Sequence, residues 1–407
     1  MTVNAVAIAA GRAAAVVLCM VLVGAVLAQP PADAPPTIGD LAVPLERGSQ
    51  VAARWSASNA TRIEVYAAAR ETASATDLLV ATLAGDARRA LIPIPASDRQ
   101  VIRVCAIGAA ASAAACVSRA LTNVVVRGDD YDPYGLGEWI PEPPVPGTLR
   151  AVIAGADRGN VIGFAADVDR IDVHGVDAAY VNPVDPTDIR PGEGWQDAHV
   201  IIDRDLLISG RADARVEIVA RSGCRGCPPE RAFSYRSRVM RVLERVTAEL
   251  EHLTLRGGAF VFEGAGIRND GTLTLRAVEV SGNRAWYEGG GILNGRTGVL
   301  TLVDSVVRGN RAATEASEVG ASFGIRGSSI VLIDVENGGY GGVFSDGSLT
   351  ANATAFEENR AFDAGGALAL WPNGETALDA VVIRGNRALA GGAIRAARRR
   401  GGRSPGP

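Results

Sequence analysis

The chain has 407 residues and carries 41 basic and 45 acidic side chains, and every basic one is arginine. Its formal net charge of −4 supplies no excess of basic groups to hold a phosphate backbone, so we expect no nucleic-acid partner. The length is sufficient for two domains.

Residues 1–28 have the pattern of a cleaved signal peptide. Arg12 precedes an apolar run from Ala13 to Ala28, and a proline-rich stretch follows directly. The run is slightly short for a membrane-spanning helix, although a retained anchor is the alternative. We therefore expect an exported protein, secreted or held at the cell surface or outer membrane, that meets a membrane only through export or surface attachment.

Residues 38–126 contain short apolar segments at the spacing of a β-sandwich. Strands are expected at 51–55, 62–66, 78–82, 90–93 and 101–105. Trp55 on an early strand, followed by Val65 and Tyr66 on the next, resembles a fibronectin type III or related immunoglobulin-like domain. The resemblance implies a spacer or binding module with Trp55 in its core.

Four cysteines follow the predicted signal peptide, and an even number in an exported chain favours disulfides. Cys105 and Cys116 are expected to bridge neighbouring strands of a hairpin. Cys224 and Cys227 have the spacing of half a zinc site or of a redox motif. Because a structural zinc ion needs four ligands and no second pair lies nearby, we expect a disulfide there and no metal.

Residues 127–147 are rich in Asp, Gly and Pro, and we expect a semi-rigid linker that sets the two domains apart. Directly after it, Thr148 is a suitable N-cap for a short helix with Leu149, Val152 and Ile153 on one face. A solenoid of stacked strands exposes its apolar core at each end, so this helix is predicted to act as a cap.

A repeated Gly-Asn-Arg-Ala sequence marks the region 148–394. It occurs at 282–285, 309–312 and 385–388, with variants at 336–339 and 358–361. A period of roughly 25 residues predicts the stacked coils of a solenoid, about nine of them here. The asparagines that mark the coils are Asn283, Asn310, Asn337, Asn359 and Asn386.

Apolar and polar residues alternate between these asparagines. Leu273 and Leu275, then Val278 and Val280, predict two short strands that face a common core. Asparagine tolerates a left-handed backbone and therefore suits the sharp turn between strands. Asparagines stacked in register are also expected to hydrogen-bond to one another along the stack.

The segment 266–285 carries a family resemblance. It reads Gly-Ile-Arg-Asn-Asp-Gly-Thr-Leu-Thr-Leu and ends in Gly-Asn-Arg-Ala. This is similar to the right-handed parallel β-helix repeats of polymorphic outer-membrane proteins and of bacterial surface proteins with a CSLREA-type leader. Residues 147–154 stand where that leader lies and keep its Leu-Arg core, but lack its Cys and Glu. The resemblance implies an all-β, pectin-lyase-like solenoid over 148–394 and an exported surface location, but no single activity.

The final segment, 395–407, is basic and is expected to form a disordered tail. No sequence that would cap the last coil follows the repeats, and an uncapped end invites edge pairing. We therefore expect a truncated or frameshifted gene, with a genuine basic tail as the alternative.

Alignment of the coils on their asparagines predicts two columns of side chains. The residue after each asparagine is arginine in four coils, and the third residue after it is often aromatic. Arginine pairs bidentately with carboxylates or sulfates, and aromatic faces stack on sugar rings, so a track for a linear anionic polysaccharide is one hypothesis. The candidate residues are Arg284, Arg311, Arg360, Arg387, Trp286, Tyr340 and Phe362.

Exposed charge repeats usually contribute little, which favours the alternative that these arginines are solvated or paired with Glu288, Glu315 and Glu357. Enzymes of this fold class include calcium-dependent lyases and glycoside hydrolases, but their familiar motifs are missing from the repeat region. We therefore expect non-catalytic adhesion to a polysaccharide or to a host or neighbouring cell surface, without a cofactor. The alternative is a lyase, which could use calcium, or a hydrolase acting on uronic-acid polymers.

Overall fold

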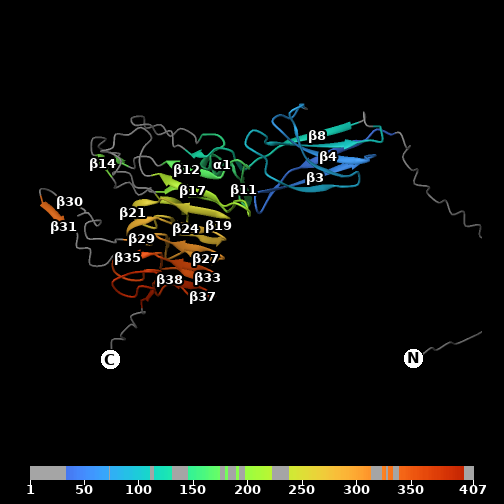
Figure 1. Ribbon diagram of the computed structural model, residues 1–407. Coiled ribbons are helices and arrows are strands. Elements are labelled where there is room, and N and C mark those ends of the chain that lie inside the picture. The colour runs from blue at the N-terminus through green and yellow to red at the C-terminus, as the bar shows by residue number, and fades with distance from the viewer. Residues whose placement is uncertain are drawn as a thin grey trace, which may run out of the picture.

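The computed structural model describes residues 34–397, apart from 73, 111–113, 131–144, 175–178, 182–188, 192–197, 222–237, 313–322, 327–328 and 333–338. The predicted signal peptide, Asn337, Cys224, Cys227 and the segment from 398 onward lie outside the described residues. The described chain is almost entirely β-structure, with an antiparallel region followed by a longer parallel region (Figure 1). Among the described helices, none is long and apolar enough to cross a membrane.

The antiparallel region consists of two four-stranded sheets, and strand residues of alternating polarity put one face of each sheet in a shared core. Trp55 is 5% exposed, as predicted, and its indole N–H donates to the carbonyl of Ala87. The first sheet contains β1 (Thr37–Ala42), β2 (Leu45–Glu46), β3 (Gln50–Ser58) and β6 (Arg89–Pro93). The second contains β4 (Arg62–Ala68), β5 (Leu78–Ala84), β7 (Val101–Ile107) and β8 (Ala114–Ala120).

A disulfide joins β7 to β8 in the second sheet. Cys105 and Cys116 lie directly opposite each other in the antiparallel ladder and form this bond. The prediction of a bridge across neighbouring strands is therefore confirmed.

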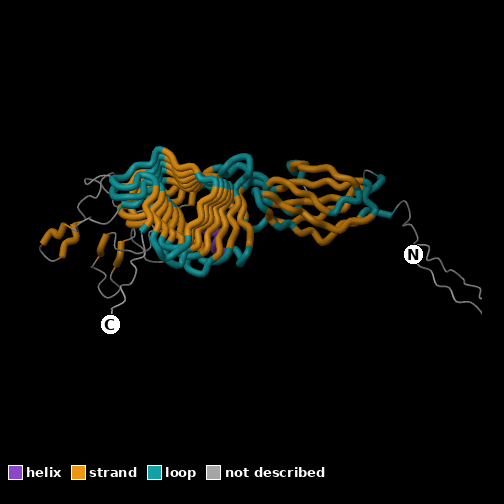
Figure 2. Tube along the Cα trace, turned by 90° about the horizontal axis from the view of Figure 1, so that it is seen from below, coloured by secondary structure: helices purple, strands orange, loops and turns teal. Residues whose placement is uncertain are grey.

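The parallel region contains three long sheets that the chain visits in turn, so that each sheet gains one strand per coil. Viewed from below, along the stack, successive strands lie over one another (Figure 2). Sheet I contains β9 (Val124–Val125), β11 (Asn160–Phe164), β16 (Leu206–Ser209), β19 (Thr247–Glu251), β23 (Thr272–Arg276), β27 (Val299–Val303), β33 (Ser348–Asn352) and β37 (Thr376–Asp379). Sheet II contains β10 (Asp129–Asp130), β12 (Arg170–His174), β17 (Val216–Arg221), β20 (Leu253–Arg256), β24 (Glu279–Ser281), β28 (Val306–Arg308), β34 (Ala355–Glu357) and β38 (Val382–Arg384).

Sheet III closes each coil, and a shorter sheet IV lies between sheets II and III along the chain. Sheet III contains β15 (Ala198–Ile202), β18 (Arg238–Val242), β22 (Ile267–Asn269), β26 (Ile292–Asn294), β32 (Val343–Ser345), β36 (Leu368–Leu370) and β39 (Ile394–Ala396). Sheet IV contains β21 (Ala259–Glu263), β25 (Arg284–Glu288), β29 (Arg311–Ala312) and β35 (Arg360–Ala361). Two antiparallel hairpins lie outside the stack: β13 (Ala179–Val181) with β14 (Ile189–Pro191), and β30 (Phe323–Arg326) with β31 (Ser329–Leu332).

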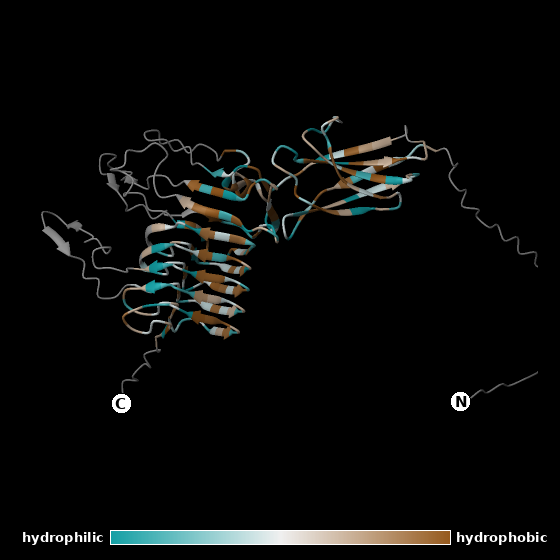
Figure 3. Ribbon diagram, in the orientation of Figure 1, coloured by the Kyte–Doolittle hydropathy of each residue, from teal (hydrophilic) through white to brown (hydrophobic). Residues whose placement is uncertain are grey.

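The core of the parallel region follows from the alternation in the sequence. Leu273, Leu275, Val278 and Val280 are completely buried, as predicted. In sheet I, Leu273 is in register with Leu300 on the next strand, so that like side chains stack along the axis. Hydrophobic residues along the stacked strands mark this core (Figure 3). The long parallel sheets make the region β-helix-like.

The first coil begins earlier in the chain than the sequence predicted. β9 pairs in parallel with β11, and β10, which belongs to the expected linker, pairs in parallel with β12. The predicted short helix forms as α1 (Leu149–Gly155), with Thr148 as its N-cap. Leu149 and Ile153 are buried, and α1 packs against β9 and β15 at this end of the stack.

The two regions are in direct contact, whereas the sequence suggested that a linker sets them apart. Gly163 on β11 lies so close to Ile94 that an added Cβ would be 2.4 Å from the isoleucine Cδ1. The hydroxyl of Ser49 donates to the carbonyl of Ser209 at 2.6 Å. The antiparallel sheets lie directly beside the first coils (Figure 1). One continuous hydrophobic core runs through both, so the two regions are not held apart.

The repeat is also less regular than predicted. Sheet I and sheet II each contain eight strands within the described chain, and β28 pairs directly with β34. The spacings of 27 and 22 residues around Asn337 are therefore one coil of 49 residues, which carries the hairpin of β30 and β31. At the other end of the repeats, Arg395 and Ala396 belong to β39, although the sequence placed them in the tail.

Candidate functional site

Four of the predicted asparagines form a ladder along the stack. The side-chain amide of Asn283 donates to Oδ1 of Asn310 at 3.0 Å, and the same bond joins Asn310 to Asn359 and Asn359 to Asn386 at 3.1 and 2.9 Å. Each of these acceptor oxygens also receives the backbone N–H of the asparagine one coil earlier. The first three asparagines are buried, and the ladder fixes the turn that follows sheet II in the coils that it joins.

The left-handed residue of each turn is not the asparagine itself, as the sequence suggested, but the one before it. Its φ is 62° at Gly282 and Gly309 and 65° at Gly385. Glycine adopts this conformation without steric cost, which explains three of the four positions. In the remaining coil the position is Glu358, with φ of 54°.

The residue after each asparagine is one of the four predicted arginines, and they stand in one column. Arg284 pairs in register with Arg311, Arg311 with Arg360, and Arg360 with Arg387. Neighbouring strands of a sheet are about 4.8 Å apart, so successive positions in the column are separated by roughly this distance. The ladder of buried asparagines holds this register.

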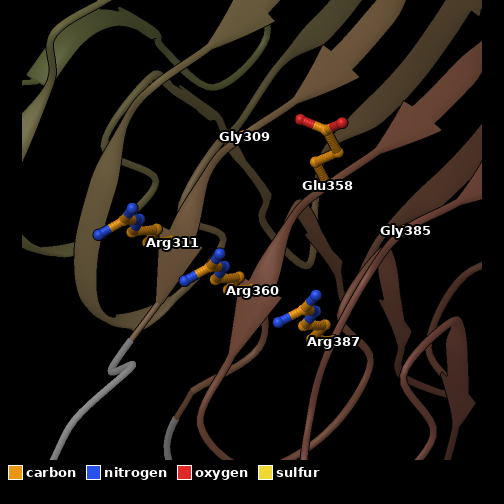
Figure 4. Close-up of a pocket in the computed structure, with 6 residues that line it drawn as sticks. All are labelled: Gly309, Arg311, Glu358, Arg360, Gly385 and Arg387. Carbon is orange, nitrogen blue, oxygen red and sulfur yellow. The ribbon is translucent and has the colours of Figure 1, made fainter.

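Three members of the column line one surface hollow of about 390 Å³. Arg311, Arg360 and Arg387 extend side by side and in the same direction (Figure 4). Glu358 contributes the one carboxylate of the lining, and it points away from the guanidinium groups (Figure 4). Gly309 and Gly385 complete the lining, and at these two positions no side chain enters the hollow.

Within the described chain, no side chain forms a hydrogen bond or ion pair with the guanidinium groups of these three arginines. Of the three acidic residues proposed as their partners, one is engaged elsewhere and another lies outside that part of the chain. Glu357 pairs with Arg384 at 2.9 Å, and Glu315 is not among the described residues. Adjacent like charges repel each other, so an anion that binds several of them would relieve this repulsion.

The aromatic column predicted beside the arginines does not form. Tyr340 is in register with Glu288 and Ala364, not with Phe362. It is only 5% exposed and packs against Phe344 and Trp371, with ring centroids 5.6 and 5.0 Å away. The irregular coil shifts the register here, because Tyr340 follows the insertion and not a ladder asparagine.

The other two aromatic candidates are Phe362 and Trp286. Phe362 is half-buried, and its N–H donates to the carbonyl of Ala312. The backbone of Trp286 belongs to β25, while its side chain is outside the described part of the structure.

A second group of polar residues lies where sheet IV turns into sheet III. Glu288 is in register with Glu263 on one side and Tyr340 on the other. Burial, together with the charges of Glu263 and Asp346, raises the pKa of Glu288 to about 7. Trp371 is half-buried beside Tyr340. Sequence reasoning named Glu288 only as a partner for arginine and did not find this group.

Among the described residues, no three His, Cys, Asp or Glu side chains are placed to hold a metal ion. Comparisons with protein-family models, with curated proteins and with solved structures find no match for this chain. Function must therefore be inferred from the arginine column and from the surroundings of Glu288.

Proposed function

We propose that this is an exported surface protein that binds a linear anionic polysaccharide along the arginine column without chemical conversion. In this proposal the parallel region is a right-handed β-helix of the kind found in polymorphic outer-membrane proteins. The antiparallel region is a fibronectin type III-like module fixed to its first coil. The ligand belongs to a bacterial matrix or to a host or neighbouring cell surface.

The observation that carries this proposal is the hollow lined by Arg311, Arg360 and Arg387. Guanidinium groups bind carboxylates and sulfates through two parallel N–H bonds, and each of the three is available for this within the described chain. Because the column runs across the strands, along the stack, a ligand that meets all three must be extended in the same direction. A polymer with repeated negative charges meets that condition.

The test is retention of the protein on immobilised polygalacturonate. We expect the double variant Arg311→Ala, Arg360→Ala to lose retention by at least tenfold, since two of three charged contacts are removed. Arg296→Ala is the matched control, because Arg296 is an exposed arginine on a different turn. Equal retention of the double variant and the control would rule out the column as the binding site.

Glycoside hydrolysis is a second candidate function, and the environment of Glu288 favours it. A carboxyl group with a raised pKa is suited to donate a proton to a leaving-group oxygen, and nearby carboxylates are available for the second role in such a reaction. Trp371 is half-buried and packs against Tyr340, which is in register with Glu288.

Two assays on uronic-acid polymers separate the candidates. Release of reducing ends that disappears in Glu288→Gln would support hydrolysis. Growth of ultraviolet absorbance in the presence of calcium would instead indicate a lyase, because elimination leaves an unsaturated sugar. Binding without either signal supports the non-catalytic proposal.

A further inference from the structure

The position of Glu358 sets one coil apart from its neighbours. In the other three coils of the ladder this position is a glycine, and the backbone is left-handed in all four. A side chain with a Cβ is disfavoured in that conformation. The turn between sheets I and II accepts residues such as Ala277 and Ala353 in the same conformation, so a left-handed residue is not unusual in itself. The distinctive feature is that a glutamate replaces glycine in the middle one of the three coils that line the cationic hollow.

The carboxylate of Glu358 is exposed and lines the same hollow as the three arginines, yet it forms no hydrogen bond or ion pair with any described side chain. A glutamate that merely neutralised the column would turn toward the guanidinium groups, whereas this one points away from them (Figure 4). It therefore presents a second kind of contact to a bound ligand: a hydrogen-bond acceptor that repels negative charge.

We infer that Glu358 is a specificity-determining residue, which favours anionic polysaccharides over densely charged polyanions such as polyphosphate. A polysaccharide presents hydroxyl groups between its charges, and a carboxylate accepts hydrogen bonds from hydroxyl groups. A polyphosphate has no hydroxyl groups between its charges, so one of its charges must face the carboxylate. This inference rests on the proposed function, because it concerns the ligand of the same column.

The experiment compares the dissociation constants for polygalacturonate and for inorganic polyphosphate at one ionic strength. Glu358→Gln removes the charge but keeps an acceptor, and Glu358→Gly restores the residue of the other coils. Glu375→Gln is the matched control, since Glu375 is an exposed glutamate that does not line the hollow. Circular dichroism confirms that each variant is folded.

We expect Glu358→Gln to bind polyphosphate about fourfold more tightly, the factor that Coulomb's law gives for two unit charges roughly 5 Å apart in water. Its affinity for polygalacturonate should stay the same, while Glu358→Gly should bind polygalacturonate more weakly because the acceptor is lost. An equal change for both polymers, or no change, would overturn the inference.

The failure of the proposed function gives a different result. In that case Arg360→Ala binds polygalacturonate as well as the wild type does, whatever the Glu358 variants do. If Arg360→Ala loses binding and the Glu358 variants keep the wild-type preference between polymers, the column is the site and only the role of Glu358 is wrong.

Discussion

Replacing Asn359 with alanine should show how strongly the asparagine ladder stabilises the stack. Asn359 is completely buried. Its Oδ1 accepts the backbone N–H of Asn310 at 3.0 Å and the side-chain amide of Asn310 at 3.1 Å. Its own amide donates to the carbonyl of Val307 at 2.9 Å. Alanine keeps none of these bonds, so the backbone N–H of Asn310, one side-chain N–H of Asn310 and the carbonyl of Val307 each lose a bond.

The expected loss follows from these groups. A buried donor or acceptor that loses its partner costs about 1–3 kcal/mol, so Asn359→Ala should lower the free energy of unfolding by at least about 3 kcal/mol. Asn386→Ala is the comparison, because Asn386 makes the same kinds of bond but is only half-buried. Water can replace its partners, and the cost there should be about 1–2 kcal/mol.

Urea unfolding followed by circular dichroism measures both variants. Hydrogen exchange of β28 and β34 shows whether the loss occurs at the coils that Asn359 joins, because a stack of coils need not unfold in one step. If Asn359→Ala cost no more than Asn386→Ala, the buried ladder would not stabilise the stack in the expected way. The same conclusion would follow if protection of β28 and β34 were unchanged.

Three further predictions concern other parts of the molecule. The pKa of Glu288 is raised from 4.5 to about 7, so between these pH values the folded state keeps a proton that the unfolded chain has released. The contribution of this proton to stability is complete below pH 4.5 and is lost as the pH rises through 7. Glu288→Gln should therefore match the wild type near pH 4 and exceed its stability above pH 7 by on the order of 1–2 kcal/mol, and parallel pH curves in urea titrations would contradict this. The disulfide between Cys105 and Cys116 closes a short loop, so the double serine variant should lose about 2–3 kcal/mol in thermal unfolding of the antiparallel region, and a reductant should affect only the wild type. The guanidinium group of Arg47 donates to Glu251 at 2.7 Å between the two regions, so Arg47→Ala should speed hydrogen exchange in β16 and β19 and leave exchange in β28 as in the wild type. The same change, or no change, in all three strands would contradict this prediction.

Much of the parallel region could be predicted from the sequence because its determinants are local and repeated. The alternation around Leu273 and Val280 specifies which side of each strand is buried, and the recurrent asparagine specifies where each coil turns. Since every coil stacks on one with the same pattern, Asn283, Asn310, Asn359 and Asn386 come into register once the coils form. The arginine column follows from the same register, because Arg311 and Arg360 each come one residue after a ladder asparagine.

The prediction of an aromatic column was wrong for a reason that the sequence does not reveal. Asn337 resembles a repeat position, but Asn310 bonds directly to Asn359 and skips it. A pattern match cannot distinguish a short coil from an insertion, because only strand pairing decides which residues are neighbours. Tyr340 therefore became a core residue beside Trp371 and not a stacking surface.

The all-β class, the turn positions, the buried stripe and the bridge between Cys105 and Cys116 could be predicted from the sequence alone. The tertiary structure alone decided the contact between the two regions, the earlier start of the first coil and the surroundings of Glu288 and Glu358. The physical reason is the range of the interactions involved. Alternation and turn preferences act between residues close in the chain, whereas the contact of Ile94 with Gly163 and the gathering of three arginines around one hollow join residues that only folding brings together.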